Sequence, residues 1–410
     1  MVLGYLDRPA MSVEAAQSES RGFVYDFAQL PAYLDVLRSR MHVAVVYGGD
    51  KHSDGAVIRA THNTRPWKSY RIVAEDIAGA LRELGFEHVV TLPDDRSLAS
   101  ELERHAIDLV WLNTGGVQGY NPVSHTPAML EMLGVPYVGQ NSLTASILDN
   151  KHVFKRVLGA LAIRTAPSFA WHPAWGAADP TRDDRFAAAF GSYQGPFILK
   201  PVSGRASVLV LTAETLEEVA EKAIQIHEQT QNTVLIEPFL GGREYCVSVC
   251  GPVVKTQSGL ARLDAPFAFS AVERVFGDGE TIFTSMDVKP ISADRVRLLD
   301  SEQDRPTREE LLEMARQIYR NLELESIVRV DVRADADGNL YVLEVNPKPD
   351  LKKPTADVTS LVTTGLAEHG LDYQALMFSL LADRLDNLLH YRPGDVRHLI
   401  ALLPRLGQAA

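Results

Sequence analysis

Hydrophobic residues along the chain occur in short runs that alternate with amphipathic stretches. His42–Tyr47, His88–Leu92 and Ile107–Leu112 are rich in apolar and β-branched residues, which is typical of buried strands. Between them, Tyr70–Leu84 and Ser97–His105 have apolar positions at helical spacing. Strands that alternate with helices over ~25–30 residues indicate a parallel sheet with helices on both faces.

The turns of this first region carry the candidate substrate residues. Ligands of a parallel sheet bind where its strands end, so Gly48-Gly49 and Thr114-Gly115-Gly116 are candidate substrate walls. A structural need for tight turns explains these glycines nearly as well. Before the first strand, Phe27–Arg38 predicts one amphipathic helix, whose apolar side carries Leu30, Tyr33, Leu34 and Leu37.

Beyond residue 148 the pattern changes from alternating βα units to mixed α+β order. Asp149–Leu158 predicts a helix, and the stretch from Trp171 to Gln194 looks like an irregular insertion rich in Pro, Gly, Ala and charge. A compact group of elements follows and suggests a second, smaller domain: strands Phe197–Leu199, Ser207–Leu211 and Thr233–Ile236, and helix Leu216–Gln229. The remaining predicted elements are strands Glu244–Val249, Arg274–Phe276, Ile327–Arg333 and Leu340–Val345, and helices Arg308–Leu322 and Tyr373–Leu389.

Composition and charge narrow the class of protein. The 410 residues are 46% hydrophobic and 23% charged, which suggests two or three domains with full cores. The net charge of −12, without a basic stripe, argues against nucleic acid as a partner. No apolar run approaches the ~18 residues that span a bilayer, and the N-terminus does not read as a signal peptide. Cys246 and Cys250 would lie about 13 Å apart on one strand, too far for a disulfide, so we expect reduced core cysteines and a cytoplasmic protein.

The most informative pattern is a predicted hairpin of two strands joined through Asp335–Asn339. Alternate residues of a strand share a face, so Arg329 and Asp331 point the same way, as do Glu344 and Asn346. Two carboxylates and an amide oxygen are hard ligands that suit Mg²⁺ with nucleotide phosphates in its shell. The alternative is a sheet face whose acids and arginine simply meet water.

Three other elements have the types of residue that a nucleotide site uses. Lys200 ends a strand beside a polar loop and could bridge phosphates. Ile236–Leu240 is a short apolar connector with an acid, which suits a purine pocket, and Glu244 could accept hydrogen bonds from ribose hydroxyls. Each of these elements by itself more often has only a structural role. Their order along the chain is what favours a nucleotide site.

That order resembles the ATP-grasp superfamily, and within it the D-alanine–D-alanine ligases and their relatives, from about His42 to Leu389. The resemblance implies an α/β ATP-grasp fold, with an N-terminal extension (1–40), a Rossmann-like domain (41–148), a small lid domain (149–239), a larger catalytic domain (240–390) and a tail (391–410). It assigns Arg329 and Lys289 to catalysis and Asp331, Glu344 and Asn346 to metal binding. It assigns nucleotide contacts to Lys151, Lys200, Ser207, Glu237, Pro238, Phe239, Leu240, Glu244 and Leu343.

The chemistry that the resemblance implies is ligation of a small carboxylate to an amine. ATP would lie between the last two domains with two Mg²⁺ ions, and the substrate carboxylate would become an acyl phosphate that the amine attacks near Arg329. The resemblance also implies a possible homodimer.

Several segments depart from the family's pattern. The loop Ser203–Ser207 replaces a glycine- and serine-rich loop, with Leu209 in place of a usual glycine. On the substrate side, the acidic motif after Gly48-Gly49 is missing, Asn113–Gly119 replaces a His-Gly motif, and Pro349–Thr355 replaces the serine segment that holds a carboxylate. We interpret this as retained chemistry with different substrates, so that D-alanine–D-alanine ligase activity itself is not expected. Lys352 and Lys353 either favour an acidic second substrate or form a solvated surface pair.

Two alternatives remain open from the sequence. The altered lid loop would suit an ATP-binding regulatory protein without catalysis, although such a protein has less need of Asp331, Glu344 and Asn346. A carboxylating or phosphotransferring ATP-grasp enzyme is the third possibility, and nothing in the N-terminal region points to it specifically.

Overall fold

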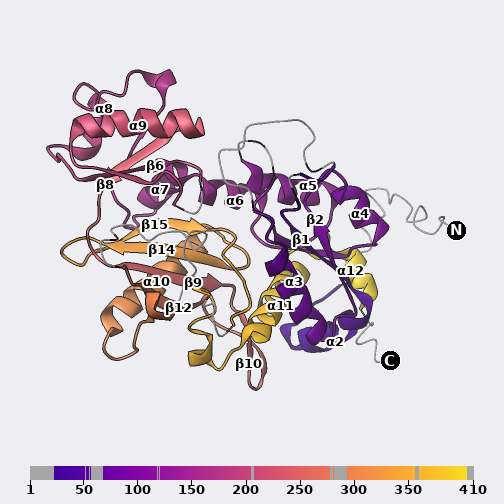
Figure 1. Cartoon of the computed structure of the whole chain (residues 1–410). Helices are drawn as coiled ribbons and strands as arrows, with labels where there is room; N and C mark the ends of the chain where they lie inside the picture. The colour runs from indigo at the N-terminus through magenta and orange to yellow at the C-terminus, as the bar shows by residue number, and fades with distance from the viewer. Residues whose placement is uncertain are drawn as a thin grey trace, which may run out of the picture.

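The computed structural model describes residues 23–277 except 51, 55, 57–67, 118, 120 and 205–206, together with 280, 293–355 and 360–403. Within these residues the strands form three main sheets and a two-stranded ribbon, arranged in three lobes (Figure 1). The α-helices are α2 (Leu30–Arg40), α3 (Arg71–Glu83), α4 (Leu98–Arg104), α5 (His125–Leu133), α6 (Ser142–Asp149), α7 (Lys151–Ala160), α8 (Asp184–Phe190), α9 (Leu216–Thr230), α10 (Arg305–Asn321), α11 (Tyr373–Tyr391) and α12 (Arg397–Leu402).

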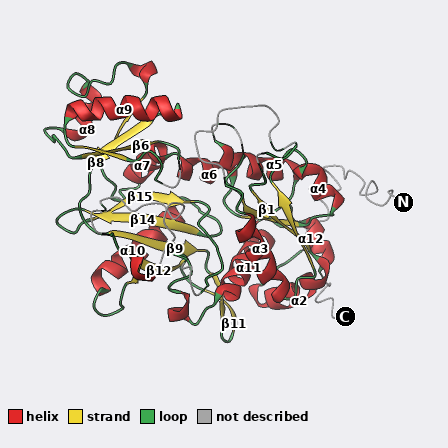
Figure 2. Cartoon of the chain, viewed as in Figure 1, coloured by secondary structure: helices red, strands yellow, loops and turns green. Residues whose placement is uncertain are grey.

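The first sheet is parallel, in the order β2-β1-β3-β4, as the alternating pattern predicts. Its strands are β1 (His42–Tyr47), β2 (His88–Pro93), β3 (Leu109–Asn113) and β4 (Tyr137–Val138). Helices cover both faces (Figure 2). Val43 and Val45 pack in the cluster that contains α3, while Ala44 and Val46 pack with α4 and α5. Because successive side chains of a strand point to opposite faces, a strand covered on both sides is continuously apolar.

The small lobe holds an antiparallel sheet in the order β5-β8-β6-β7 with α8 and α9 packed on it. Its strands are β5 (Phe169–Trp171), β6 (Phe197–Pro201), β7 (Leu211–Ala213) and β8 (Val234–Pro238). The strand predicted at Ser207–Leu211 is wrong, since β7 begins only at Leu211. Ser207 and Leu209 have φ angles of 53° and 56°, which an extended strand does not accommodate.

The sequence between Trp171 and Gln194 is more regular than predicted. It contains the 3₁₀ turn Pro173–Trp175 and the helix α8. Asp183 caps α8 by accepting a hydrogen bond from the backbone N–H of Arg185 at 2.9 Å. Phe186 of α8 is buried against the small sheet, so this segment belongs to the core of its lobe.

The larger sheet is antiparallel, in the order β13-β12-β9-β14-β15. Its strands are β9 (Glu244–Cys250), β12 (Phe267–Arg274), β13 (Val296–Leu298), β14 (Val328–Ala334) and β15 (Leu340–Asn346), and the ribbon consists of β10 (Val253–Thr256) and β11 (Gly259–Arg262). Valines of β9 and β14 pack in one buried cluster with α7 and α10. The strand expected at Arg274–Phe276 is wrong, because Arg274 ends β12. The predicted hairpin is confirmed as β14 and β15, joined through Asp335–Asn339.

The C-terminal helix α11 returns to the first lobe and packs in the same core as α2 and α3 (Figure 1). The helix predicted before the first strand is confirmed as α2, whose buried residues are Leu30, Tyr33, Leu34 and Leu37. Tyr25 donates a hydrogen bond to Asp386 of α11 at 2.6 Å. Tyr25 and α2 therefore pack against the core of the first lobe.

Two further sequence expectations concern single features of the fold. Cys246 and Cys250 are buried and not bonded to each other, as expected. Among the described residues, no helix has the length and apolarity needed to cross a membrane.

Candidate active site

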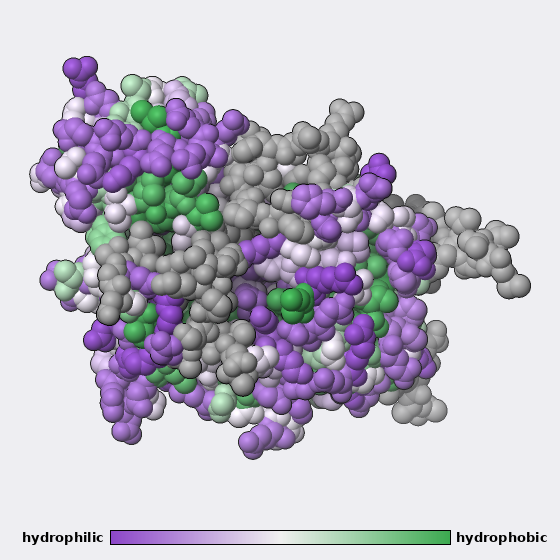
Figure 3. All heavy atoms as spheres, viewed as in Figure 1, coloured by the Kyte–Doolittle hydropathy of each residue, from purple (hydrophilic) through white to green (hydrophobic). Residues whose placement is uncertain are grey.

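A cavity lies between the small antiparallel sheet and the larger one. In the space-filling view, apolar residues gather on the side of the small lobe that faces the larger sheet (Figure 3). All nine predicted nucleotide-contacting residues line this cavity, together with the metal-ligand candidates Asp331 and Glu344. The tertiary structure thus brings together residues that are up to 193 positions apart, from Lys151 to Glu344.

Glu237, at the end of β8, lies between two lysines at the inner wall of the cavity. Its carboxylate forms ion pairs with Lys155 of α7 and Lys200 of β6, and its side chain is 2% exposed. Burial by itself would raise the pKa of Glu237, but the two ammonium groups outweigh it and hold the pKa below its usual range. Glu237 therefore stays ionised and fixes the positions of two cations.

Lys155 is the member of this group that sequence reasoning missed. It is fully enclosed, and burial lowers the pKa of its ammonium group. It also donates a hydrogen bond to Thr165 Oγ1 at 2.6 Å. The available signal was its spacing, because residues four apart on a helix share a face and Lys151 was already a candidate.

The start of α7 positions Lys151. The helix predicted at Asp149–Leu158 is broken at Asn150, which ends α6 and accepts a hydrogen bond from the backbone N–H of Val153 at 3.0 Å. Lys151 Nζ donates to the carbonyl oxygen of Gly204 at 3.1 Å and lies 3.0 Å from Glu344 Oε2. This lysine thus connects the loop after β6 with the metal-ligand strand.

The hairpin β14–β15 places its polar residues as predicted. Asp331 pairs in register with Glu344, and Arg329 pairs with Asn346. Arg329 holds Asp331 through two hydrogen bonds, Nε to Oδ1 at 2.7 Å and Nη2 to Oδ2 at 2.9 Å. Arg329 and Asn346 do not line the cavity with the other candidates.

Arg274, at the end of β12, is a second residue that sequence reasoning missed. Its guanidinium donates to Glu244 Oε1 at 2.6 Å and to Asp331 Oδ2 at 3.1 Å. Burial would raise the pKa of Asp331, but Arg274 and Arg329 together hold it below its usual range. No local pattern marks Arg274, because its partners come from β9 and β14, which only the sheet pairing brings alongside.

The donor set of the hairpin fits Mg²⁺ by chemical type. Asp331, Glu344 and Asn346 offer carboxylate and amide oxygens on one face of the sheet. The Glu344 side chain is 31% exposed into the cavity, and Lys151 holds its pKa below the usual range against the effect of burial. Asp331 already accepts three hydrogen bonds from two arginines, so a metal ion there would share this carboxylate with them.

Apolar residues also line the cavity and suit a flat ring. They include Pro238, Phe239, Leu240, Leu343 and Ile198. The guanidinium carbon of Arg333 lies 4.8 Å from the centre of the Phe239 ring and Arg333 Nη1 lies 3.5 Å from Glu244 Oε2.

The phosphate side of the cavity includes the loop that departs from the family's pattern. Ser207 lines the cavity with a φ of 53°, so its backbone turns where a strand was predicted. The neighbouring Arg205 lies outside the described residues. The base of the loop is fixed, because Ser203 Oγ donates to Asp149 Oδ2 at 2.7 Å.

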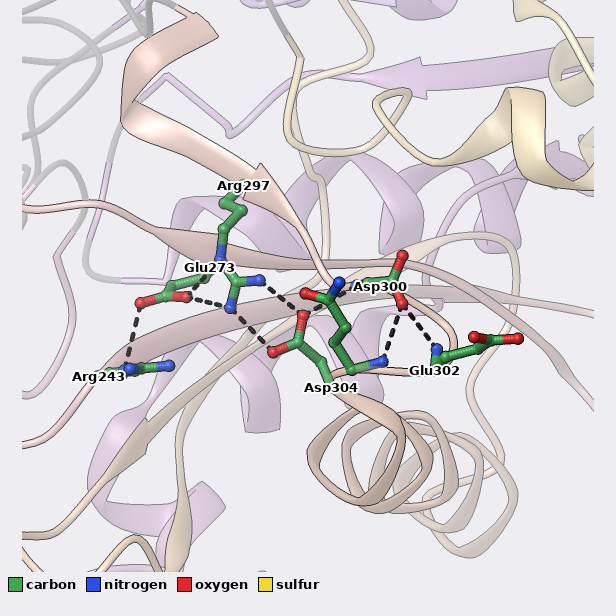
Figure 4. Close-up of polar contacts among 7 residues, drawn as sticks. Arg243, Glu273, Arg297, Asp300, Glu302 and Asp304 are labelled. Atoms are coloured by element: carbon green, nitrogen blue, oxygen red, sulfur yellow. Dashed lines mark hydrogen bonds and ion pairs between the residues drawn. The ribbon is translucent and has the colours of Figure 1, made fainter.

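Lys289, the second predicted catalytic residue, also lies outside the described residues. The strand β13 that follows it is anchored by a network on the outer side of the sheet (Figure 4). Arg297 donates to Glu273 Oε2 at 2.7 Å and to Asp304 Oδ2 at 2.6 Å, and so joins β12 to the start of α10.

Two glycines of the candidate substrate walls have a clear structural reason. A Cβ at Gly48 would collide with the carbonyl oxygen of Lys68, and one at Gly116 with that of Pro122. Next to these turns, Asp94 Oδ2 accepts hydrogen bonds from Thr114 at 2.6 Å and Thr126 at 2.8 Å. Close backbone packing therefore explains Gly48 and Gly116.

Comparisons with known proteins agree with this geometry. The family model described as the D-Ala D-Ala ligase C-terminus matches residues 174–382, just over half of the chain. The D-alanine–D-alanine ligase of Aquifex aeolicus is 27% identical over 301 residues, which cover 73% of this chain and 90% of that protein. The D-alanine–D-alanine ligase of a Synechococcus strain is 28% identical over 308 residues, covering 75% and 86%.

Solved structures share the fold at lower sequence identity. D-alanyl-alanine synthetase A from Vibrio cholerae superposes with a TM-score of 0.62 at 18% identity, covering 85% of this chain and 99% of that one. The Bacillus anthracis D-alanine–D-alanine ligase complexed with ATP has a TM-score of 0.58 at 19% identity, with the same coverage. The match of the family model over half of the chain shows that this protein belongs to the D-alanine–D-alanine ligase family of ATP-grasp ligases.

Proposed function

We propose that the protein is an ATP-dependent ligase that joins an amino acid or small carboxylic acid to an amine through an acyl phosphate. The observation that carries this proposal is the convergence of lysines, acids and an apolar wall in one cavity, in a chain of the D-alanine–D-alanine ligase family. We propose a biosynthetic role in making small molecules or peptides.

The nucleotide would occupy the cavity in one orientation. The adenine would lie against Phe239 and Leu343, with the backbone of the Glu237–Leu240 connector at its amino edge. Glu244 would accept hydrogen bonds from the ribose, in exchange for one of its arginine partners. Lys151, Lys200 and Ser207 would contact the phosphates.

Asp331, Glu344 and Asn346 would hold magnesium, with two ions expected. Magnesium bound there would neutralise phosphate charge as the γ-phosphoryl group moves. Among the residues of the chain itself, Lys151 would link the phosphates to Glu344, because its ammonium lies 3.0 Å from that carboxylate.

Arg329 would orient Asp331 and stabilise the reacting acyl group. It uses Nε and Nη2 on Asp331, and an arginine has further N–H donors for a substrate oxygen. For Lys289 we propose the catalytic role that the resemblance implies. The cavity walls would exclude water while the acyl phosphate exists. The proposed domain division at residues 41, 149 and 240 would place this chemistry between the second and third domains, and the homodimer stays a prediction.

An ATP-binding regulatory protein without catalysis is the second candidate function. The contact of Arg274 with Asp331 at 3.1 Å favours it, because an arginine can neutralise this acid without a metal. Leu209 in the altered loop favours it as well.

Phosphate release from Mg·ATP separates the two functions. Pools of amino acids and small carboxylic acids are offered in pairs with amines, and ADP and phosphate are measured. A ligase releases phosphate only with a particular carboxylate and amine pair, and the product of that pair contains a new amide bond. Tight ATP binding without stimulation by any pool would establish the regulatory function instead.

A further inference from the structure

Lys155 lies behind the residues that line the nucleotide cavity. It is not one of the lining residues, and its side chain is 2% exposed. Its ammonium forms an ion pair with Glu237, whose carboxylate also forms an ion pair with Lys200. Glu237 and Lys200 both line the cavity. Lys155 is therefore placed to act on a bound nucleotide through Glu237 rather than by contact.

A chain of hydrogen bonds connects Lys155 to β15. Lys155 Nζ donates to Thr165 Oγ1 at 2.6 Å, and Thr165 Oγ1 donates to the carbonyl oxygen of Val342 at 2.7 Å. Val342 belongs to β15 in the larger sheet, whereas Lys200 belongs to β6 in the small sheet. Glu237 is thus held between a lysine anchored on the larger sheet and a lysine of the small lobe.

The two lysines use different oxygens of the same carboxylate. Glu237 Oε1 faces Lys155 and Oε2 faces Lys200. Burial lowers the pKa of Lys155, and the charge of Glu237 acts in the opposite direction. The departure of either lysine would therefore leave Glu237 with one ion pair rather than none.

We propose that Lys155 is a positioning residue that lets Lys200 turn from Glu237 to the phosphates of ATP. This inference rests on the proposed function, in which Lys200 contacts those phosphates. With Lys200 alone, its departure would leave a buried carboxylate without a cation, which is strongly unfavourable. Because Lys155 stays on Glu237, the carboxylate keeps a partner while Lys200 binds phosphate. Lys155 therefore reduces the cost of nucleotide binding without touching the nucleotide.

Removal of the Lys155 ammonium should hold Lys200 on Glu237. Lys155→Met leaves one buried lysine with one buried glutamate, which is a complete ion pair, so we expect this variant to fold. Lys155→Gln removes the same charge and keeps a group that can donate to Thr165. In both variants the affinity for a non-hydrolysable ATP analogue with Mg²⁺, measured by calorimetry, should fall by at least about tenfold.

Lys222 of α9 provides a matched control in the same lobe. Its Nζ lies 2.6 Å from Glu218 Oε2 and donates to the carbonyl oxygen of Thr212 at 2.5 Å. Like Lys155, it thus has a glutamate and a neutral oxygen as partners, but neither Lys222 nor Glu218 lines the cavity. Lys222→Met should leave the affinity for the analogue unchanged.

A double variant distinguishes positioning of Lys200 from a general loosening of the site. Lys155→Met combined with Glu237→Gln removes the carboxylate that retains Lys200, so most of the lost affinity for the analogue should return. If Lys155 only supports the structure, the two changes should instead add their losses. Adenosine, which has no phosphates, should bind every variant as it binds the unaltered protein, which competition against the analogue measures.

The outcomes separate this inference from the proposed function. Loss of analogue affinity in both Lys155 variants, with recovery in the double variant and unchanged adenosine binding, supports the inference. Unchanged analogue affinity in Lys155→Met and Lys155→Gln overturns it and leaves the proposed function intact. Equal losses for the analogue and adenosine without recovery, or a failure of both variants to fold, would show a purely structural role and would also overturn it. An unaltered protein that binds no analogue would overturn the proposed function, and this inference with it.

Discussion

Two sets of acids in this protein differ in what lies against them. In the cavity between the antiparallel sheets, Glu237, Asp331 and Glu344 each face lysine or arginine, and these cations hold their pKa values below the usual range. In the lobe of the parallel sheet, Asp94 is held by two threonine hydroxyls, and burial raises its pKa. Asp383 of α11 accepts a hydrogen bond from the backbone N–H of Val253 at 3.1 Å, and burial raises its pKa to about 7.

The difference shows what each group of acids is suited to. A neutral donor offsets only part of the cost of burying a charge, as the two threonine hydroxyls do for Asp94, whereas a nearby ammonium or guanidinium group offsets more of it. The cavity therefore keeps its acids ionised near neutral pH, as metal and nucleotide chemistry needs. Asp94 and Asp383 are suited to holding turns and helices in place. Four changes test this contrast, from the largest expected effect to the smallest.

Glu344→Gln removes one ionised acid from the cavity without changing its size. If Glu344 holds a metal, phosphate release with the true substrate pair should fall by at least about a hundredfold, since a catalytic metal supplies several kcal/mol to the transition state. The measurement is kcat at saturating Mg·ATP, with Glu302→Gln, an exposed acid on the outer face, as the control. A variant that retains more than a tenth of the activity would exclude Glu344 from the metal set.

Glu237→Gln leaves two enclosed ammonium groups without their shared partner. Breaking a buried pair in this way costs about 3–5 kcal/mol, so the small lobe should open far more often. Hydrogen exchange of the β6 and β8 amides should speed up by about a hundredfold or more. Glu218→Gln is the matched control, because Glu218 pairs with Lys222 at 2.6 Å on the exposed side of α9 and should change exchange little.

Asp383→Asn tests the opposite kind of buried acid. The folded protein binds the proton of Asp383 more tightly than the unfolded chain does, so stability falls as pH rises from about 4 to about 7 and stays low above that. Asparagine keeps the oxygen that accepts from Val253 and carries no charge. It should stabilise the protein at pH 8 by up to about 4 kcal/mol and have a much smaller effect at pH 4.

Urea unfolding at the two pH values measures the effect of Asp383→Asn. Equal stabilisation at both pH values would show that Asp383 has the same protonation state in the folded and the unfolded protein, contrary to what its burial predicts. Destabilisation by Asp383→Asn at pH 8 would instead indicate that a cation lies against Asp383. That result would contradict the contrast between the two groups.

Arg297→Ala tests ion pairs that are exposed to solvent. Arg297 is 42% exposed in the outer network with Glu273 and Asp304 (Figure 4). Exposed pairs contribute at most about 1 kcal/mol, so the unfolding midpoint should shift slightly and ATP affinity should stay unchanged. A large loss of ATP affinity would mean that β13 and the segment before it act on the cavity.

Local pattern was sufficient for much of the fold and for part of the site. The hairpin of β14 and β15 followed from alternation and from the turn at Asp335–Asn339, and its register places Asp331 opposite Glu344 as expected. The parallel sheet followed from its doubly covered apolar strands. The errors at Ser207–Leu211 and at Arg274–Phe276 arose where backbone conformation or strand ends depend on distant partners.

The sequence by itself determined the periodic elements, the order of the candidate nucleotide residues and the absence of a local disulfide, because each depends on neighbours within a few positions. Only the tertiary structure decided that Lys155 shares Glu237 with Lys200 and that Arg274 lies between Glu244 and Asp331. The physical reason is that a buried charge needs a partner, and which partner it finds depends on how separate sheets pack rather than on its place in the chain.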